Sequence, residues 1–600
     1  MRMTRRIFIC ILVGILIIAS LPFSASAVTS GNAVYNYRVN ADRKSITLIG
    51  CRPYDESEID IPSEIDGYTV TGIAGRFLIS NMIVKAVHIP DTVTVIEGQA
   101  FHDCRNLEEV TLPEGLTEIA DEMFDNCVSL QTIAIPENVT RIGNYAFSEC
   151  RALTIEALPE KLTSIGIGAF MGCEKLAVAE LPETLTTIQF GAFQDTAISS
   201  VTLSEYVTYV GDYAFADCEA LTSVEIRNPE SGRIGSYAFS GCTALTDVVL
   251  PDTLDQIGVG WFAGCSSLSN IVIPETITSI GSNAFYSCGL EKIDIPEGVT
   301  YIRNGAFAYN DFSEVVLPKS VTFIADALFR GCKYLQSVEF LGNITDIGDC
   351  AFENCSALTS FTIPSGVTSI GVSAFASTPL SSIEIPESVT EIWDEAFRSC
   401  TSLAQISIPA GVEIIGENAF LDTAYYAEAA NWENGLLYLD NCLIVADPSV
   451  GAEVYVKEGT TLIADGAFLK VTDLKSLWLP FSIRFIGIHL FYYSRALPND
   501  WKGDWVKVSY NGTQEEYVSQ VKQRFIEIEF RGYRIAHITP GDIDGDGAVT
   551  ALDALLLREY FVKLCELSDY EQSRADVNRD GVIDARDQLL LRRILSGLAE

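Results

Sequence analysis

The chain has 600 residues, with 80 acidic and 40 basic side chains and a formal net charge of −40. This charge disfavours nucleic acid and anionic membrane surfaces as partners, because both repel an acidic protein. Sixteen cysteines and four histidines leave disulfides, metal sites and thiol chemistry open until their spacing is considered.

The N-terminus has the pattern of an export signal. Three arginines within the first six residues precede an apolar run at 7–19, and Ala-Ser-Ala follows at 25–27. The run is too short for a transmembrane helix, and its flanks match a cleaved secretory signal. The pattern predicts a signal peptide at 1–27 and a secreted mature chain.

One sequence unit then recurs through most of the chain. Around Phe147 it reads Ile-Pro-Glu-Asn-Val-Thr-Arg-Ile-Gly-Asn-Tyr-Ala-Phe-Ser-Glu-Cys, from Ile135 to Cys150. Successive units are 22 to 24 residues apart, except for one step of 48. The phenylalanines that anchor the units are Phe77, Phe101, Phe124, Phe147, Phe170, Phe193, Phe215, Phe239, Phe262, Phe285, Phe307, Phe329, Phe352, Phe375, Phe397, Phe420, Phe468 and Phe491.

A repeat of this length predicts a solenoid, because one unit cannot bury its own apolar face but stacked units can. In each unit we expect a short strand at Leu-x-x-Ile-x-Ile-Pro and an extended stretch at Val-Thr-x-Ile-Gly on the opposite wall. The recurring order Ile-Pro, Ile-Gly, Ala-Phe-x-x-Cys resembles the BspA-like leucine-rich repeat of bacterial and protozoan surface proteins. The fold class is therefore a repeat solenoid of mainly short parallel strands at 59–500, with caps at 28–58 and 501–538.

Eleven cysteines occupy one position of the repeat, three residues after the phenylalanine. Side chains at equivalent positions of stacked repeats point the same way, whereas a disulfide needs facing Cβ atoms. We therefore expect small buried thiols, and no metal site, because no histidine or Cys-x-x-Cys pattern accompanies them. These cysteines are Cys104, Cys127, Cys150, Cys173, Cys218, Cys242, Cys265, Cys288, Cys332, Cys355 and Cys400.

The step of 48 residues holds an insertion at about 422–464. Two apolar segments in it, at 435–440 and 453–456, predict the strands of a hairpin. On the outward positions of the repeat strands, Val249, Val272 and Val316 form a weak apolar strip among hydroxyls and carboxylates.

Patterns that would indicate catalysis are lacking in the sequence. No G-x-S-x-G, H-E-x-x-H or P-loop pattern occurs, so we expect a protein that is not an enzyme. No serine or cysteine nucleophile motif accompanies the histidines, which are His88, His102, His489 and His537.

Two acidic segments near the C-terminus match a calcium-binding loop. Both carry oxygen side chains at loop positions 1, 3, 5, 9 and 12 and glycine at position 6, which suits a loop wrapped around Ca²⁺. Each is followed by Leu-Leu-Leu-Arg. The expected ligands are Asp542, Asp544, Asp546, Thr550 and Asp553 with the carbonyl of Ala548, and Asp576, Asn578, Asp580, Asp584 and Asp587 with the carbonyl of Val582.

The duplicated loop resembles the half EF-hands of a type I dockerin, over about Gly541 to Leu598. The resemblance implies a small α-helical module at 539–600 that binds two Ca²⁺ ions and docks onto a cohesin domain of a scaffold protein. A module of this size buries little core, so metal binding would also stabilise its fold. The cohesin contacts that the resemblance implies are Ala551, Leu552, Arg558 and Lys563 in the first half, and Ala585, Arg586, Arg592 and Arg593 in the second.

Together these features predict a secreted, non-catalytic component of a cellulosome-type complex that degrades polysaccharide, either extracellular or attached to the cell surface through a scaffold. The dockerin would attach the protein, and the solenoid would bind a protein or act as a spacer. One alternative is a carbohydrate-binding or carbohydrate-active component, with a site in the insertion or the C-terminal cap, near Trp432, Trp501 and Trp505. Another is a cell-surface adhesin.

Overall fold

The computed structural model describes residues 27–53 and 57–490, apart from gaps at 31–32, 179, 228–232, 473, 475, 481 and 488–489, together with the strand at 507–510. The chain divides into two compact units, Met1–Val321 with Leu328–Gly342, and Thr322–Ala327 with Asn343–Glu600. The predicted signal peptide up to residue 26, both calcium loops and the expected cohesin contacts lie outside the described residues.

The first unit begins with a six-stranded sheet. Its strands are β1 Ala27–Ser30, β2 Ala33–Val39, β3 Ser45–Pro53, β5 Glu64–Ile65, β6 Tyr68–Ile73 and β8 Val95–Ile96. β2 pairs antiparallel with β1 and β3, and β3 pairs parallel with β6, so the sheet continues directly into the repeats. The buried ring of Tyr35 stacks on Phe77 at 6.5 Å between centroids. The sheet thereby covers apolar residues that the first coil would otherwise expose to water.

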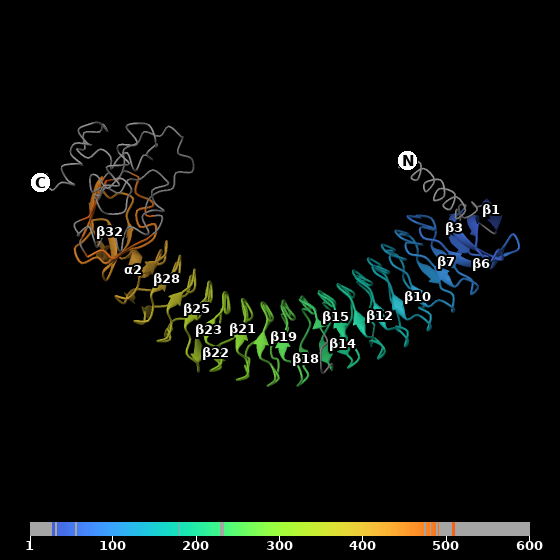
Figure 1. Ribbon diagram of the computed structural model, residues 1–600, viewed down its shortest axis with the longest axis horizontal. Coiled ribbons are helices and arrows are strands. Elements are labelled where there is room, and N and C mark those ends of the chain that lie inside the picture. Colours follow the sequence, from blue (N-terminus) through green and yellow to red (C-terminus); the bar gives the residue numbers. More distant parts are fainter. Residues whose placement is uncertain are drawn as a thin grey trace, which may run out of the picture. The chain divides into compact units, whose positions relative to one another are not determined.

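Beyond this sheet, the first unit consists of stacked coils, one for each sequence repeat (Figure 1). Each Ile-Gly segment forms a two-residue strand that is parallel to its neighbour and in register with it, as when Ile142 pairs with Ile165. These strands are β10 Glu118–Ile119, β11 Arg141–Ile142, β12 Ser164–Ile165, β13 Thr187–Ile188, β15 Tyr209–Val210 and β17 Arg233–Ile234 in one sheet, and β19 Gln256–Ile257, β20 Ser279–Ile280 and β21 Tyr301–Ile302 in another.

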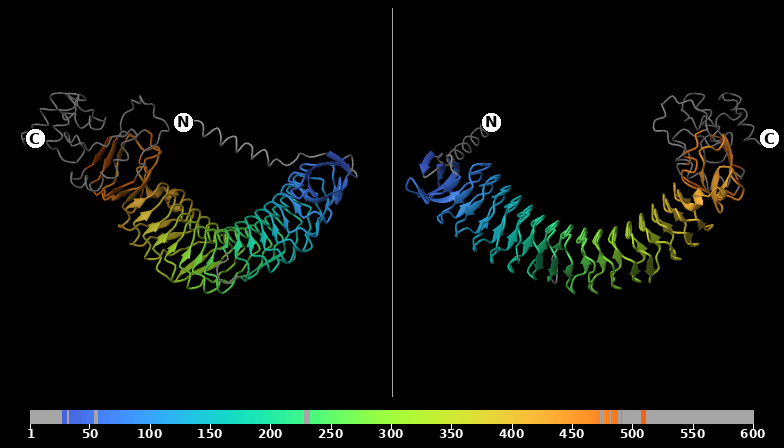
Figure 2. Two further views of the ribbon diagram at one scale, coloured as in Figure 1. Left: turned by 45° about the vertical axis from the view of Figure 1, so that its right-hand side comes forward. Right: turned by 180° about the vertical axis from the view of Figure 1, so that it is seen from behind.

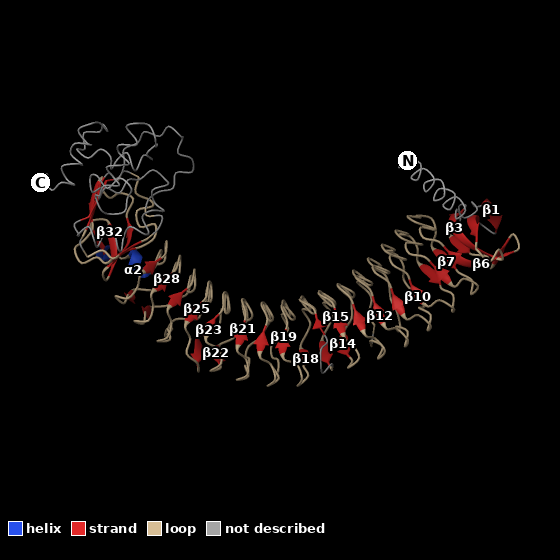
Figure 3. Ribbon diagram, in the orientation of Figure 1, coloured by secondary structure: helices blue, strands red, loops and turns tan. Residues whose placement is uncertain are grey.

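The opposite wall is less regular. Its strands in the first unit are β4 Glu58–Asp60, β7 Ala86–His88, β9 Glu109–Thr111, β14 Ser200–Leu203, β16 Ser223–Ile226, β18 Asp247–Val249, β22 Glu314–Leu317 and β24 Ser337–Phe340. Some coils between them keep single bridges, such as Glu109 with Thr132. Our expectation of a strand here in every repeat was therefore wrong. The proline that closes the segment removes a ladder donor and leaves few residues to pair, and turns and loops make up most of each coil (Figure 3).

The second unit follows the same plan, and its coils also lie side by side in the two further views of Figure 2. The Ile-Gly wall consists of β23 Phe323–Ile324, β25 Asp346–Ile347, β26 Ser369–Ile370, β28 Glu391–Ile392 and β30 Ile414–Ile415. On the opposite wall, β27 Ser382–Glu384 pairs parallel with β29 Gln405–Ser407.

The insertion differs from the predicted hairpin. Its strand β32, Leu436–Leu439, pairs antiparallel with β33, Cys442–Ala446, and not with the segment at 453–456. Asp440 has a φ of 50° in the two-residue connection between them, which suits a tight hairpin turn. The second predicted segment is β34, Glu453–Tyr455, and it pairs parallel with the repeat strand β36, Ser476–Leu479.

Two short helical segments lead into this hairpin. α2 spans Ala424–Ala427 and η1 spans Ala429–Asn431. The Thr423 hydroxyl caps α2 by accepting a hydrogen bond from the Tyr426 backbone N–H at 3.1 Å. The remaining strands of the second unit are β31 Trp432–Glu433, β35 Leu462–Ile463, β37 Phe485–Ile486 and β38 Lys507–Tyr510.

A stack of phenylalanine rings forms the centre of each unit. In the first unit, the rings from Phe101 to Phe329 follow one another at 5.3 to 6.1 Å between centroids, with interplanar angles of 0 to 25°. In the second unit, the rings from Phe352 to Phe420 are 5.2 to 5.5 Å apart. The rings are fully buried, so each coil completes the apolar core of the next.

Candidate functional surfaces of the repeat array

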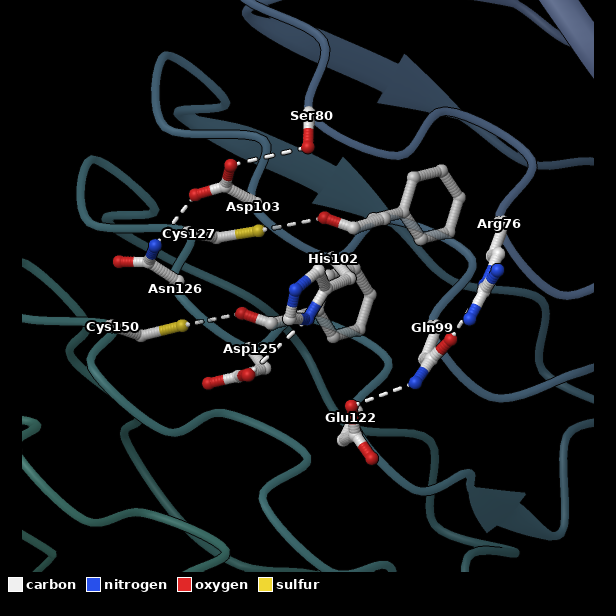
Figure 4. A network of polar contacts seen from close by, with 12 residues as sticks. Arg76, Ser80, Gln99, His102, Asp103, Glu122, Asp125, Asn126, Cys127 and Cys150 are labelled. Carbon is white, nitrogen blue, oxygen red and sulfur yellow. Dashed lines mark hydrogen bonds and ion pairs between the residues drawn. The ribbon is translucent and has the colours of Figure 1, made fainter.

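The cysteines that recur three residues after the phenylalanine are free and buried, which confirms the prediction of stacked thiols without bridges. Cys127 Sγ lies 3.1 Å from the carbonyl oxygen of Phe101 in the preceding coil, and Cys150 Sγ lies 3.1 Å from that of Phe124 (Figure 4). Burial raises the pKa of the Cys104 thiol to about 12. Neutral, enclosed thiols are poor nucleophiles and metal ligands, so this row is structural.

Threonine and asparagine replace the cysteine in a few coils and also donate to a phenylalanine carbonyl, the threonine within its own coil and the asparagine across to the preceding one. In the first unit, Thr196 Oγ1 donates to the Phe193 carbonyl at 2.9 Å, and Asn310 Nδ2 donates to the Phe285 carbonyl at 2.7 Å. Both side chains are buried. The repeat position therefore favours a small side chain with a donor rather than a thiol as such, although Val471 occupies it after Phe468.

Partly exposed tyrosines along the turns were missed by the sequence analysis. Tyr145, Tyr213 and Tyr237 each stand two residues before an anchoring phenylalanine, a regularity that could have revealed them. The rings of Tyr213 and Tyr237 stack at 5.2 Å with an interplanar angle of 7°. The Tyr145 ring lies against Gly168 of the next coil, where an added Cβ would meet it at 2.6 Å. Contacts within the protein thus cover ring faces that a sugar would need for stacking.

The apolar strip on the opposite wall lies where the sequence placed it. Val249, Val272 and Val316 are 50%, 75% and 43% exposed. The exposed Asp294 interrupts the strip, and β-branched side chains on a sheet surface are often just good strand formers. The strip is therefore a weak candidate for a protein contact.

The tryptophan of the insertion, Trp432, packs and hydrogen-bonds within the insertion itself. Trp432 Nε1 donates to the Tyr426 carbonyl at 2.8 Å, and the two rings meet edge to face at 5.3 Å. A nearby hollow, lined by Glu417, Tyr426 and Lys470, has a volume of about 20 Å³, which suits a water molecule and not a sugar ring. Trp501 and Trp505 lie outside the described residues.

Within the described ranges, we find no helix long and apolar enough to cross a bilayer.

Comparison with protein families identifies both parts of the chain. The profile described as "BspA type Leucine rich repeat region" matches in six copies, at 75–197, 142–231, 186–312, 232–355, 300–428 and 451–499. The profile of the dockerin type I domain matches residues 540–596. These matches confirm the two resemblances drawn from the sequence. The search of curated proteins found no match.

Solved structures of leucine-rich proteins are similar to this chain. One is a leucine-rich repeat protein from Bacteroides ovatus, which is 23% identical over 76% of this chain and 95% of its own, with a TM-score of 0.43. Another is a leucine rich cell surface protein from Faecalibacterium prausnitzii, which is 30% identical over 64% of this chain and 94% of its own, with a TM-score of 0.41. A third, from T. pallidum, is 28% identical over 37% of this chain and 91% of its own, with a TM-score of 0.28.

Proposed function

The chain belongs to the BspA-type leucine-rich repeat family and carries a type I dockerin domain, and from this premise we propose that it is a secreted, non-catalytic component of a cellulosome-type assembly. Both families are non-catalytic. The dockerin match at 540–596 carries the proposal, because that module attaches proteins to cohesin domains. In this function the dockerin docks onto a scaffold, and the repeats bind a protein or act as a spacer in the degradation of polysaccharide.

Calcium would control the docking. The two loops supply mainly carboxylate oxygens at the positions that a twelve-residue calcium loop uses, beginning with Asp542 and Asp576. We propose two ions, held by the side chains and carbonyls named from the sequence. Because the module is small, its folding and its docking should both require the metal.

The repeats support a binding or spacing role better than a catalytic one. The interior of each unit is a stack of rings and neutral thiols, such as Phe147 and Cys150, and among the described residues no charged side chain is buried in it. The wall of short Ile-Gly strands is regularly spaced, which suits contact with an extended partner surface.

Titration of the full chain with a panel of cohesin domains tests the proposal. We expect binding to at least one cohesin in the presence of Ca²⁺ and loss of binding after chelation. Replacing the first ligand of both loops, Asp542→Asn with Asp576→Asn, should abolish it. Asp252→Asn removes an exposed carboxylate from the repeats and should leave it unchanged. Binding that survives chelation, or that no cohesin shows, would contradict the proposal.

A further inference from the structure

Three side chains from two adjacent coils of the first unit converge near its N-terminal end. His102 directly follows Phe101, and Asp125 occupies the equivalent position after Phe124 in the next coil. Glu122 approaches them from the same turn as Asp125. One ligand atom from each of these three side chains lies within 4.8 Å of the other two.

One ring nitrogen of His102 is not satisfied by hydrogen bonding. Its Nδ1 atom is shielded from solvent and makes no hydrogen bond, although Asp125 Oδ2 lies 3.2 Å away (Figure 4). The contact therefore has the distance of an ion pair without the direction of a hydrogen bond. A buried nitrogen without a hydrogen-bond partner is costly, and a cation between it and the carboxylates would satisfy all three groups.

Neighbouring side chains hold the two carboxylates in place. Gln99 Nε2 donates to Glu122 Oε2 at 2.8 Å, and Gln99 Oε1 accepts from Arg76 Nε at 2.9 Å. The Ser148 hydroxyl, from the following coil, bonds to the Asp125 carboxylate. Partners of this kind orient the ligands of protein metal sites.

We propose that His102, Glu122 and Asp125 form a binding site for a divalent transition-metal ion, with Zn²⁺ as the best fit. Zinc binds imidazole nitrogen and carboxylate oxygen at about 2.0–2.2 Å, which places neighbouring ligands roughly 3.3 Å apart. The contact of 3.2 Å between His102 and Asp125 already matches this separation. An imidazole ligand favours zinc over Ca²⁺ and Mg²⁺, which prefer oxygen.

The ion would clamp the coil of Phe101 to the coil of Phe124. Two carboxylates balance its charge, and three protein ligands leave a position for water. The site is independent of the proposed docking function, because it lies in the repeats and uses different ligands.

A second cluster in the same unit provides a matched control. Glu58, Asp60 and His88 also lie within 4.8 Å of one another. Both ring nitrogens of His88 have partners there, Glu58 Oε1 at 3.0 Å and Thr111 Oγ1 at 3.0 Å. The two carboxylates are exposed. This cluster has the same residue types but no unsatisfied nitrogen, so we expect it to bind zinc much more weakly.

The test is a zinc titration of the full chain in excess Ca²⁺, which keeps the dockerin loops occupied, against a competing chelator. We expect one zinc ion per chain at the high-affinity site. Asp125→Asn, Glu122→Gln and His102→Ala should each weaken it at least about tenfold, whereas His88→Ala should not. Circular dichroism checks that each variant is folded. If His102→Ala does not fold, Glu122→Gln still tests the proposal.

Cobalt identifies the ligand type. Co²⁺ bound in the site should show weak d–d absorption without the intense charge-transfer band of thiolate ligation, which excludes binding by the cysteines. Zinc binding that persists in Asp125→Asn and Glu122→Gln, that is lost in His88→Ala, or that shows thiolate character with cobalt would overturn the proposal. So would the absence of saturable binding, which would leave His102 and Asp125 as an ion pair only.

Discussion

The thiol of Cys127 donates to the carbonyl oxygen of Phe101 in the preceding coil, with 3.1 Å between sulfur and oxygen. This contact joins the two rows that fill the interior, because the acceptor belongs to the residue whose ring stacks on Phe124. The Phe101 carbonyl also accepts from the Cys104 backbone N–H at 3.3 Å, so the thiol supplies a second donor to a carbonyl inside the core. Cysteine and asparagine at this position donate to the carbonyl of the preceding coil, whereas threonine donates to the phenylalanine carbonyl of its own coil.

Serine should therefore be tolerated better than alanine in the thiol row. Cys242 Sγ lies 3.2 Å from the Phe215 carbonyl. Cys242→Ser keeps a donor for this carbonyl and should lower the free energy of unfolding by less than about 1 kcal/mol. Cys242→Ala leaves the carbonyl unpaired beside a small cavity and should cost about 1–3 kcal/mol. Urea denaturation of the two variants measures both values, and the opposite order would refute the role of the hydrogen bond.

The thiols should make the repeats sensitive to alkali. Burial raises the pKa of Cys218 from its ordinary value of 9.0 to about 11 and that of Cys104 to about 12. The unfolded chain loses these protons first, so the contribution to stability is complete below pH 9.0 and is lost as the pH rises through the folded values. We expect the free energy of unfolding to fall above pH 9 by up to about 1.4 kcal/mol per pH unit for each thiol.

Denaturation at a series of pH values measures this dependence. Cys218→Ala should reduce the fall of the unfolding free energy with pH by the contribution of one thiol. The stability of this variant at neutral pH is measured separately. In the folded chain at neutral pH the buried thiols should also resist a thiol reagent and become reactive on unfolding. Rapid labelling of most of them before unfolding would contradict their enclosure in the core.

Replacing a non-glycine residue that has a left-handed backbone conformation by glycine should stabilise the protein. Ala327 has a φ of 53°, where a side chain costs about 1 kcal/mol or more. Ala327→Gly removes this cost at the expense of greater freedom in the unfolded chain, so we expect a gain in stability of up to about 1 kcal/mol. Ala357 lies outside the left-handed region, and Ala357→Gly should lose about 0.5–1 kcal/mol. Thermal unfolding of the pair should show shifts of opposite sign, and a loss in both would refute the prediction.

The sequence was sufficient to predict the features that depend on one repeat stacked on a similar neighbour. Phe147 and Cys150 recur at nearly constant spacing, so the ring stack and the parallel thiols follow from stacking alone. Our prediction paired the wrong strands of the hairpin, because a second apolar segment at 453–456 resembled a partner strand. The turn at Asp440 instead allows β32 to pair with the strand that follows it at once.

Features that depend on differences between neighbouring repeats could not be predicted from the repeat pattern. The Tyr145 ring lies against Gly168 of the next coil, a contact that a search for aromatic residues does not reveal. His102 and Asp125 are 23 residues apart and meet because they share one position in adjacent coils. A comparison of equivalent positions between adjacent repeats, applied to charged residues as well as to the core, would have brought them together.

The two halves of the dockerin should not be equivalent in docking. The duplication allows two orientations related by a half-turn, but loop position 11 is Leu552 in the first half and Arg586 in the second. Leucine offers an apolar anchor, whereas a buried arginine needs a partner charge. We therefore expect the cognate cohesin to prefer the half that bears Leu552.

Paired variants decide the orientation. In calorimetric titrations of the full chain with its cohesin in Ca²⁺, Leu552→Asp should weaken binding by at least about 1–2 kcal/mol, because it places an unpaired charge at the centre of the contact. Arg586→Ala should cost less, since in this orientation Arg586 remains at the rim or in solvent. Both variants leave the proposed calcium ligands intact, so the calcium affinity of each should equal that of the parent chain and serves as the control for folding. A cohesin that is indifferent to Leu552→Asp but loses affinity on Arg586→Ala would show that docking uses the second half instead.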